Sequence, residues 1–118
     1  MTGVLNGRRI LVVEDEVLVA AFIEDALMEF GAVVVGPAHR IEDGMAMARD
    51  EQIDAAVLDV NLNDQRSDPI AGVLKDRGIP YLLATGYGDA VTSSEVPVLS
   101  KPYTPESLVQ ALGRLPMN

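Results

Sequence analysis

Five short apolar runs recur along the chain, and segments of a different pattern separate them. The runs cover residues 9–13, 32–36, 55–59, 81–84 and 96–99. Short runs rich in branched aliphatic side chains are typical of strands that are buried on both faces of a parallel sheet. Because crossovers between parallel strands are right-handed, few topologies fit such a chain. We therefore predict an α/β fold, a doubly wound five-stranded parallel sheet of order 2-1-3-4-5 with helices on both faces.

Helical periodicity follows the first run. Apolar residues between Val19 and Phe30 recur three or four positions apart, which gives a helix one buried face. Gly31 then suits the left-handed position that closes a helix. Further helices are expected over residues 41–49 and 68–77. The last helix has Thr104 as its cap and Pro105 in its first position, and its buried face is expected to contain Leu108, Leu112 and Leu115.

Other segments are expected to carry less regular structure. Residues 1–7 read as a loose lead-in, and residues 61–68 read as a polar loop. Pro37 is expected to stop the second strand. Residues 87–95 carry few apolar anchors, so any helix there should be short or mobile.

The length and composition fit one domain of residues 1–118. The chain has 18 acidic and 9 basic residues, and its net charge of −9 argues against nucleic acid as a partner. Cysteine is absent, which fits a reducing cytosol, and neither a signal peptide nor an apolar stretch of about 18 residues is present. We therefore expect a cytoplasmic protein without a membrane partner.

Polar residues stand where the predicted strands end. Glu14 and Asp15 follow the first strand, Asp59 ends the third, Thr85 ends the fourth and Lys101 comes shortly after the fifth. In a doubly wound sheet, ligands bind beyond the carboxyl ends of the strands, beside the point where the strand order reverses. A single acid such as Asp59 could simply cap the next turn, but all these groups at one sheet edge indicate a site.

Such a site favours a divalent cation. Two like charges about 4 Å apart repel by about 4 kcal/mol at an effective dielectric near 20, so Glu14, Asp15 and Asp59 need a positive partner. Ligands that are all oxygen atoms suit Mg²⁺, and the carbonyl of Asn61 could complete the set. A carboxylate can also act as the nucleophile on phosphorus, with Lys101 and Thr85 contacting the phosphoryl oxygens. Alternatively, Lys101 forms a structural ion pair with Asp59 or Asp15, which is compatible with that role.

From residue 10 to residue 115 the chain resembles the receiver domains of two-component response regulators, which have the flavodoxin-like fold. The motifs that carry the resemblance are Val12-Val13-Glu14-Asp15-Glu16, Leu58-Asp59-Val60-Asn61-Leu62, Ala84-Thr85-Gly86 and Lys101-Pro102. The resemblance implies that Asp59 accepts phosphate from a histidine kinase or a histidine phosphotransfer protein. It implies that Asp15, Asp59 and the Asn61 carbonyl bind Mg²⁺, with Glu14 acting through water, and that Thr85 and Lys101 contact the phosphoryl group.

The chain departs from the family pattern at the position of the usual switch. Many receivers carry Tyr or Phe three residues before the lysine, where this chain has Val98. Residues 83–88, Leu-Ala-Thr-Gly-Tyr-Gly, are similar to the Phe-Ala-Thr-Gly motif of a receiver subgroup that is often found as stand-alone regulators. The candidate switch residues are therefore Gly86, Tyr87, Val98 and Pro102, with residues 86–95 as the moving segment.

These features predict a single-domain response regulator, a phospho-switched binding module or a phosphorelay shuttle or sink, rather than an enzyme. The alternative is a small Mg²⁺-dependent phosphatase that uses Asp59 as nucleophile. Phosphatases of that kind commonly carry a second Asp two residues later as general acid, where this chain has Asn61. We expect a monomer, with a weak dimer as the alternative.

Overall fold

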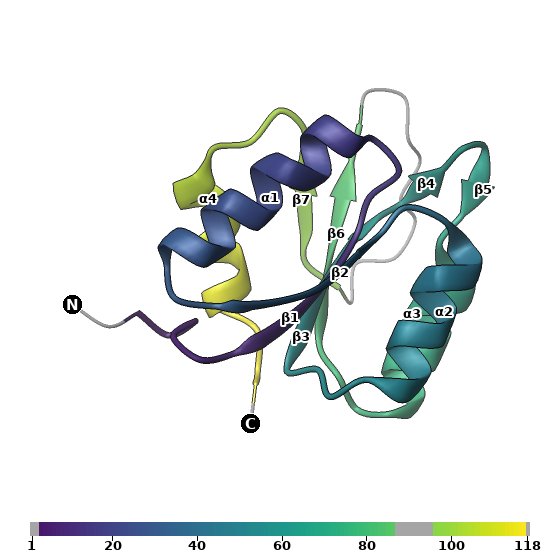
Figure 1. The fold of residues 1–118 in the computed structure, drawn as a ribbon, viewed down its shortest axis with the longest axis horizontal. Coiled ribbons are helices and arrows are strands. Elements are labelled where there is room, and N and C mark those ends of the chain that lie inside the picture. Colours follow the sequence, from purple (N-terminus) through teal and green to yellow (C-terminus); the bar gives the residue numbers. More distant parts are fainter. Residues whose placement is uncertain (1–2, 87–95, 118) are drawn as a thin grey trace.

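Five parallel strands form one twisted sheet in the computed structural model, which describes residues 3–86 and 96–117. The strands are β1 (Arg9–Val13), β2 (Val33–Ala38), β3 (Ala55–Asp59), β6 (Tyr81–Thr85) and β7 (Val98–Ser100). Their order is β2-β1-β3-β6-β7, and each neighbouring pair is parallel (Figure 1). The predicted order 2-1-3-4-5 is therefore confirmed, because the two short strands β4 and β5 pair only with each other.

Helices cover both faces of the sheet (Figure 1). They are α1 (Val17–Glu29), α2 (Ile41–Asp50), α3 (Asp68–Asp76) and α4 (Pro105–Gly113). The helix α1 packs with α4 on one face, and α2 packs with α3 on the other. The predicted α/β architecture with two helical layers is thus confirmed.

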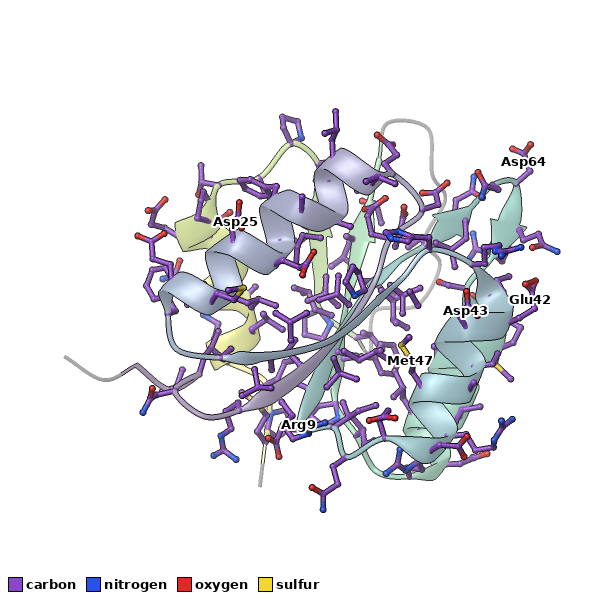
Figure 2. All side chains as sticks on the ribbon, in the orientation of Figure 1. Arg9, Asp25, Glu42, Asp43, Met47 and Asp64 are labelled. Carbon is purple, nitrogen blue, oxygen red and sulfur yellow. The ribbon has the colours of Figure 1, made fainter. Side chains whose placement is uncertain are left out.

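Alternation along the central strands divides the core between the two faces. Ile10 and Val12 lie in the cluster under α1 and α4, whereas Leu11 and Val13 lie in the cluster under α2 and α3. These residues are at most 1% exposed, as expected for strands that are buried on both sides. Figure 2 shows Met47 pointing from α2 toward the sheet, where it packs on the second cluster. This core fixes the strand ends that carry the polar residues.

The ends of several elements differ from the predictions. The strand β2 continues past Pro37 to Ala38, because β2 is an edge strand and proline removes a donor there without breaking a central ladder. The strand β7 begins at Val98, two residues later than predicted. Thr104 caps α4 as predicted, accepting a hydrogen bond from the Ser107 N–H at 3.0 Å. That helix ends at Gly113, although Leu115 beyond it is still buried.

The predicted polar loop over residues 61–68 contains a small antiparallel hairpin. Its strands are β4 (Asn61–Leu62) and β5 (Gln65–Arg66). Asn63 and Asp64 form the turn with φ of 51° and 67°, the left-handed values that a tight hairpin turn requires. Leu62 is 1% exposed and belongs to the core, so the hairpin is attached to the domain.

The description of residues 1–7 as a loose lead-in is wrong for the part that the structure describes. Leu5 is fully buried in the cluster under α1 and α4, and the Gly7 N–H donates to the Gly31 carbonyl at 2.8 Å. The two apolar residues Val4 and Leu5 are too short a run to show a periodicity that would reveal which of them is buried. The described part of the chain contains no helix with both the length and the apolar character needed to cross a bilayer.

Replacing Leu5 with alanine is expected to lower the free energy of unfolding by about 2–5 kcal/mol, because the change leaves a cavity in the core. The neighbouring Val4 is 62% exposed, so Val4→Ala serves as the control, with an expected effect within about 0.5 kcal/mol. Urea denaturation measures both. Equal stabilities of the two variants would contradict the expected contribution of Leu5 burial to stability.

Candidate functional site

Three carboxylates from two strand ends meet at one edge of the sheet. Glu14 and Asp15 follow β1, and Asp59 is the last residue of β3. Each offers an oxygen atom, and these atoms all lie within 4.8 Å of one another. Glu14 is fully buried and Asp59 is 4% exposed. The topology explains the meeting, because β1 and β3 are adjacent and parallel and both end at this edge, beside the reversal of strand order.

Lys101 supplies the positive charge between two of these carboxylates. Its Nζ donates to Glu14 Oε1 at 2.8 Å and to Asp59 Oδ2 at 3.2 Å. The lysine side chain is 19% exposed, while the side chains of Glu14 and Asp59 are 1% and 5% exposed. The predicted ion pair with Asp59 is thus present, and its second partner is Glu14 rather than Asp15. One ammonium group shared by two buried carboxylates leaves the cluster short of positive charge.

The pKa values of the cluster reflect this imbalance. Burial raises the pKa of Asp59 to about 8, and the Glu14 carboxylate adds to the effect while Lys101 opposes it. Burial also opposes the charge of Lys101, but hydrogen bonds and attraction from Glu14 and Asp59 outweigh burial and raise its pKa above the usual range. For Asp15, burial opposes the charge, but hydrogen bonds from the Asn63 N–H and with the side chains of Glu14 and Asp59 outweigh burial and lower its pKa. Of the two aspartates, Asp59 with its raised pKa therefore holds a proton more readily than Asp15 with its lowered pKa.

An open pocket of about 500 Å³ lies over the cluster. The described residues that line it are Asp15, Glu16, Asp59, Asn61, Asn63, Asp64, Gly86 and Lys101. None of them is a histidine or a cysteine, and their donors are oxygen atoms apart from the lysine and the backbone and amide nitrogens. Such a donor set fits a hard cation such as Mg²⁺ better than a softer metal.

The other predicted site residues lie around this pocket. Asn61 lines it, and the Asn61 N–H donates to Asp59 Oδ1 at 3.2 Å. Thr85 is 7% exposed at the end of β6, and its carbonyl accepts a hydrogen bond from the Lys101 N–H at 2.7 Å. Gly86 also lines the pocket. The ends of β6 and β7 therefore bring both candidate phosphoryl-contacting residues to the edge that carries Asp59.

The candidate switch residues do not lie together in one place. Val98 is 42% exposed on β7, and Pro102 lines a second, apolar groove together with Lys101. Tyr87 and the rest of the segment 87–95 lie outside the described residues, so the predicted movement of that segment stays a prediction.

Sequence reasoning missed three residues near the site. Tyr103 lines the apolar groove beside Lys101 and packs on Phe22 at 5.9 Å between ring centroids. Its hydroxyl is buried and has no hydrogen-bond partner among the residues that the structure describes, and burial raises its pKa to about 12. The Nδ1–H of His39 donates to the Glu14 carbonyl at 2.9 Å, and the Asn63 N–H donates to Asp15 Oδ2 at 3.0 Å. No sequence pattern marks these contacts, because each depends on which segments the fold brings together.

Comparisons with known proteins agree on one kind of domain. No family model matches the chain. The sensory transduction protein LytT of Bacillus cereus is 32% identical over 113 residues, which are 90% of this chain and 46% of LytT, so the chain spans about half the length of the curated relatives it matches. SdrG from Sphingomonas melonis Fr1 is 39% identical, with a TM-score of 0.79 over 93% of this chain and 95% of that one.

Two further solved structures extend the comparison. The BeF₃-activated conformation of SdrG is 38% identical, with a TM-score of 0.74 over 95% of this chain and 96% of that one. A CheY-like response regulator receiver domain protein from Methanospirillum hungatei JF-1 has a TM-score of 0.77 at 24% identity, over 91% of each chain, and shares the fold.

Proposed function

Because the chain belongs to the receiver domains of two-component response regulators, we propose that it accepts a phosphoryl group on Asp59. The donor is a histidine kinase or a histidine phosphotransfer protein, and the site of action is the cytoplasm. The observation that carries the proposal is the placement of Asp59. It is buried at the end of a central strand, between two further carboxylates and a lysine, and it faces an open polar pocket.

The transfer replaces one bond to phosphorus by another. An Asp59 carboxylate oxygen attacks the phosphorus atom, an O–P bond forms, and the P–N bond to the donor histidine breaks, with its electron pair returning to the imidazole. Lys101 holds the Asp59 carboxylate at 3.2 Å before transfer and would neutralise phosphoryl charge after it. Asp15, Asp59 and the Asn61 carbonyl would hold Mg²⁺, with Glu14 acting through water, and the cation when bound supplies charge neutralisation for the phosphoryl oxygens. The Thr85 hydroxyl would donate to one of those oxygens.

The same contacts account for a switch. Phosphorylation adds about −1.5 to −2 charges and strong acceptor oxygens, which draw Thr85 and Lys101. These two residues are already joined by the 2.7 Å backbone hydrogen bond, so a pull on either reaches both strand ends. We propose that Gly86, Tyr87 and Pro102 transmit the pull, since Val98 has no ring to move. The chain would act as a phospho-switched binding module or as a phosphorelay shuttle.

The test is incubation with acetyl phosphate and Mg²⁺ followed by intact mass measurement. A mass increase of one phosphoryl group is expected for the wild type and none for Asp59→Asn. Asp64→Asn, which removes another carboxylate of the same pocket, is the matched control and should retain the increase. If neither acetyl phosphate nor a histidine kinase adds a phosphoryl group to the wild type, the proposal is wrong. Sustained turnover of a phosphomonoester would favour the phosphatase alternative.

Cation binding is expected to depend on pH in a defined direction. Because the pKa of Asp59 is raised to about 8, a proton competes with Mg²⁺ below that pH. The apparent Mg²⁺ affinity should therefore fall as the pH is lowered from 8.5 to 6, by up to about tenfold per pH unit for one displaced proton. Calorimetric titration at several pH values measures this slope. An affinity that does not change over this range would mean that Asp59 is ionised before the cation arrives.

A further inference from the structure

The β4–β5 hairpin is anchored to the domain at its base. Leu62 is buried in the core cluster under α2 and α3. The Ser67 N–H donates to the Val60 carbonyl at 3.0 Å, and the buried Ser67 hydroxyl lies 3.3 Å from the same oxygen. The two strands are paired through Asn61 with Arg66 and Leu62 with Gln65. The hairpin is therefore a fixed arm that begins two residues after Asp59.

The tip of this arm is anchored to the acidic cluster. The Asn63 N–H donates to Asp15 Oδ2 at 3.0 Å, across 48 positions of sequence. Asn63 can present its N–H there because it adopts a φ of 51°, a left-handed conformation that asparagine and glycine tolerate better than other residues. Figure 2 shows Asp64 at the outer tip of the same turn. Asn61 thus lies between a base held by the core and a tip held by Asp15.

We propose that Asn63 is a positioning residue for the cation site, acting through its backbone N–H. This inference rests on the proposed function, because it concerns the Mg²⁺ site of that function. The N–H binds one oxygen of Asp15 in the lining of the pocket, and it thereby fixes the orientation in which the carboxylate meets a cation. Through the hairpin it also fixes the place of Asn61 beside Asp59. Groups that orient metal ligands in this way commonly alter metal affinity about 10- to 100-fold when they are removed.

The turn allows the N–H to be tested apart from the side chain. Asn63→Pro removes the N–H and cannot adopt a positive φ. Asn63→Gly removes the side chain amide but keeps the N–H and favours the φ that the turn needs, so it is the matched control. Asn63→Ala keeps the N–H but strains the turn. The full chain is used throughout, and Mg²⁺ binding is measured by calorimetric titration at pH 8 without any phosphoryl donor.

We expect Asn63→Pro to bind Mg²⁺ about 10- to 100-fold more weakly than the wild type, and Asn63→Gly to bind it like the wild type. The Asn63 amide proton should also exchange slowly in the wild type, as measured by NMR. Far-UV circular dichroism checks the fold of each variant. If Asn63→Pro does not fold, Asn63→Ala decides, and it should bind more weakly than Asn63→Gly.

Equal Mg²⁺ affinities of the wild type and a folded Asn63→Pro would overturn the positioning role of Asn63 and leave the proposed function standing. An equal loss in Asn63→Gly would also overturn it, because the side chain would then be responsible. Failure of the wild type to bind Mg²⁺ would instead remove the proposed cation site, and the positioning role with it. The three outcomes are distinguished by the same titrations.

Discussion

Replacing Lys101 with methionine is expected to lower the free energy of unfolding of the metal-free protein by about 3–5 kcal/mol at pH 8. Lys101 Nζ lies 2.8 Å from Glu14 Oε1 and 3.2 Å from Asp59 Oδ2, and both carboxylates are buried. Without the ammonium group these two carboxylates have no neutralising partner among the described residues. A loss of this size is a large part of the about 5–15 kcal/mol that stabilises a typical domain.

Two conditions should reduce this loss. At pH 5 to 6 the effect should be smaller, because Asp59 with its raised pKa takes up a proton and relieves the repulsion. Saturating Mg²⁺ should also restore stability, by about 2.7 kcal/mol at a concentration of 100 times the Kd. Lys75 is exposed on α3, so Lys75→Met is the control, with an expected change within about 0.5 kcal/mol. Urea denaturation in chelator that gives the same stability for both variants at pH 8 would contradict the argument.

The acidic cluster was predictable from sequence because parallel strands place their carboxyl ends at one edge. Once the alternating runs indicate a doubly wound sheet, Glu14, Asp15 and Asp59 must converge, whatever the loops do. The order of the strands follows in the same way from short right-handed crossovers. These inferences need the period of the pattern and the strand ends, and both are local properties of the sequence.

What could not be predicted depends on tertiary context. The predicted order already places the second strand at an edge, where proline is tolerated, but the sequence pattern does not show how far β2 continues past Pro37. The burial of Leu5 depends on the residues that happen to surround it. The turn at Asn63 and Asp64 lacks the glycine that usually marks a tight hairpin, so residues 61–68 read as a loop. The contact of Asn63 with Asp15 follows from that hairpin and was missed with it.

The same contacts of Lys101 with two buried carboxylates predict an effect of opposite sign when Asp59 is replaced by asparagine. In metal-free buffer at pH 8, Asp59→Asn is expected to raise the free energy of unfolding by about 1–3 kcal/mol. The reason is that Lys101 keeps its shorter contact, 2.8 Å to Glu14, and the cluster then contains one buried pair instead of two carboxylates that share one ammonium. Asp59 is thus expected to lower the stability of the metal-free protein, although the proposed phosphoryl transfer requires it.

The gain from Asp59→Asn should depend on pH in one direction. Asp59 has a folded pKa raised to about 8 from 3.8, so the protonated carboxyl is favoured by folding. Its contribution to stability is fully present below pH 3.8 and is lost as the pH rises to about 8, while the variant has no such loss. The difference in free energy of unfolding between variant and wild type should therefore grow from pH 4 to 8 and then level off.

With saturating Mg²⁺ the difference should shrink or reverse, because the cation stabilises the wild type through Asp59. Denaturant titrations at pH 4, 6 and 8, with chelator and with Mg²⁺, measure all of these differences. If the variant is less stable than the wild type at pH 8 in chelator, repulsion between the carboxylates of Asp59 and Glu14 does not destabilise the metal-free protein.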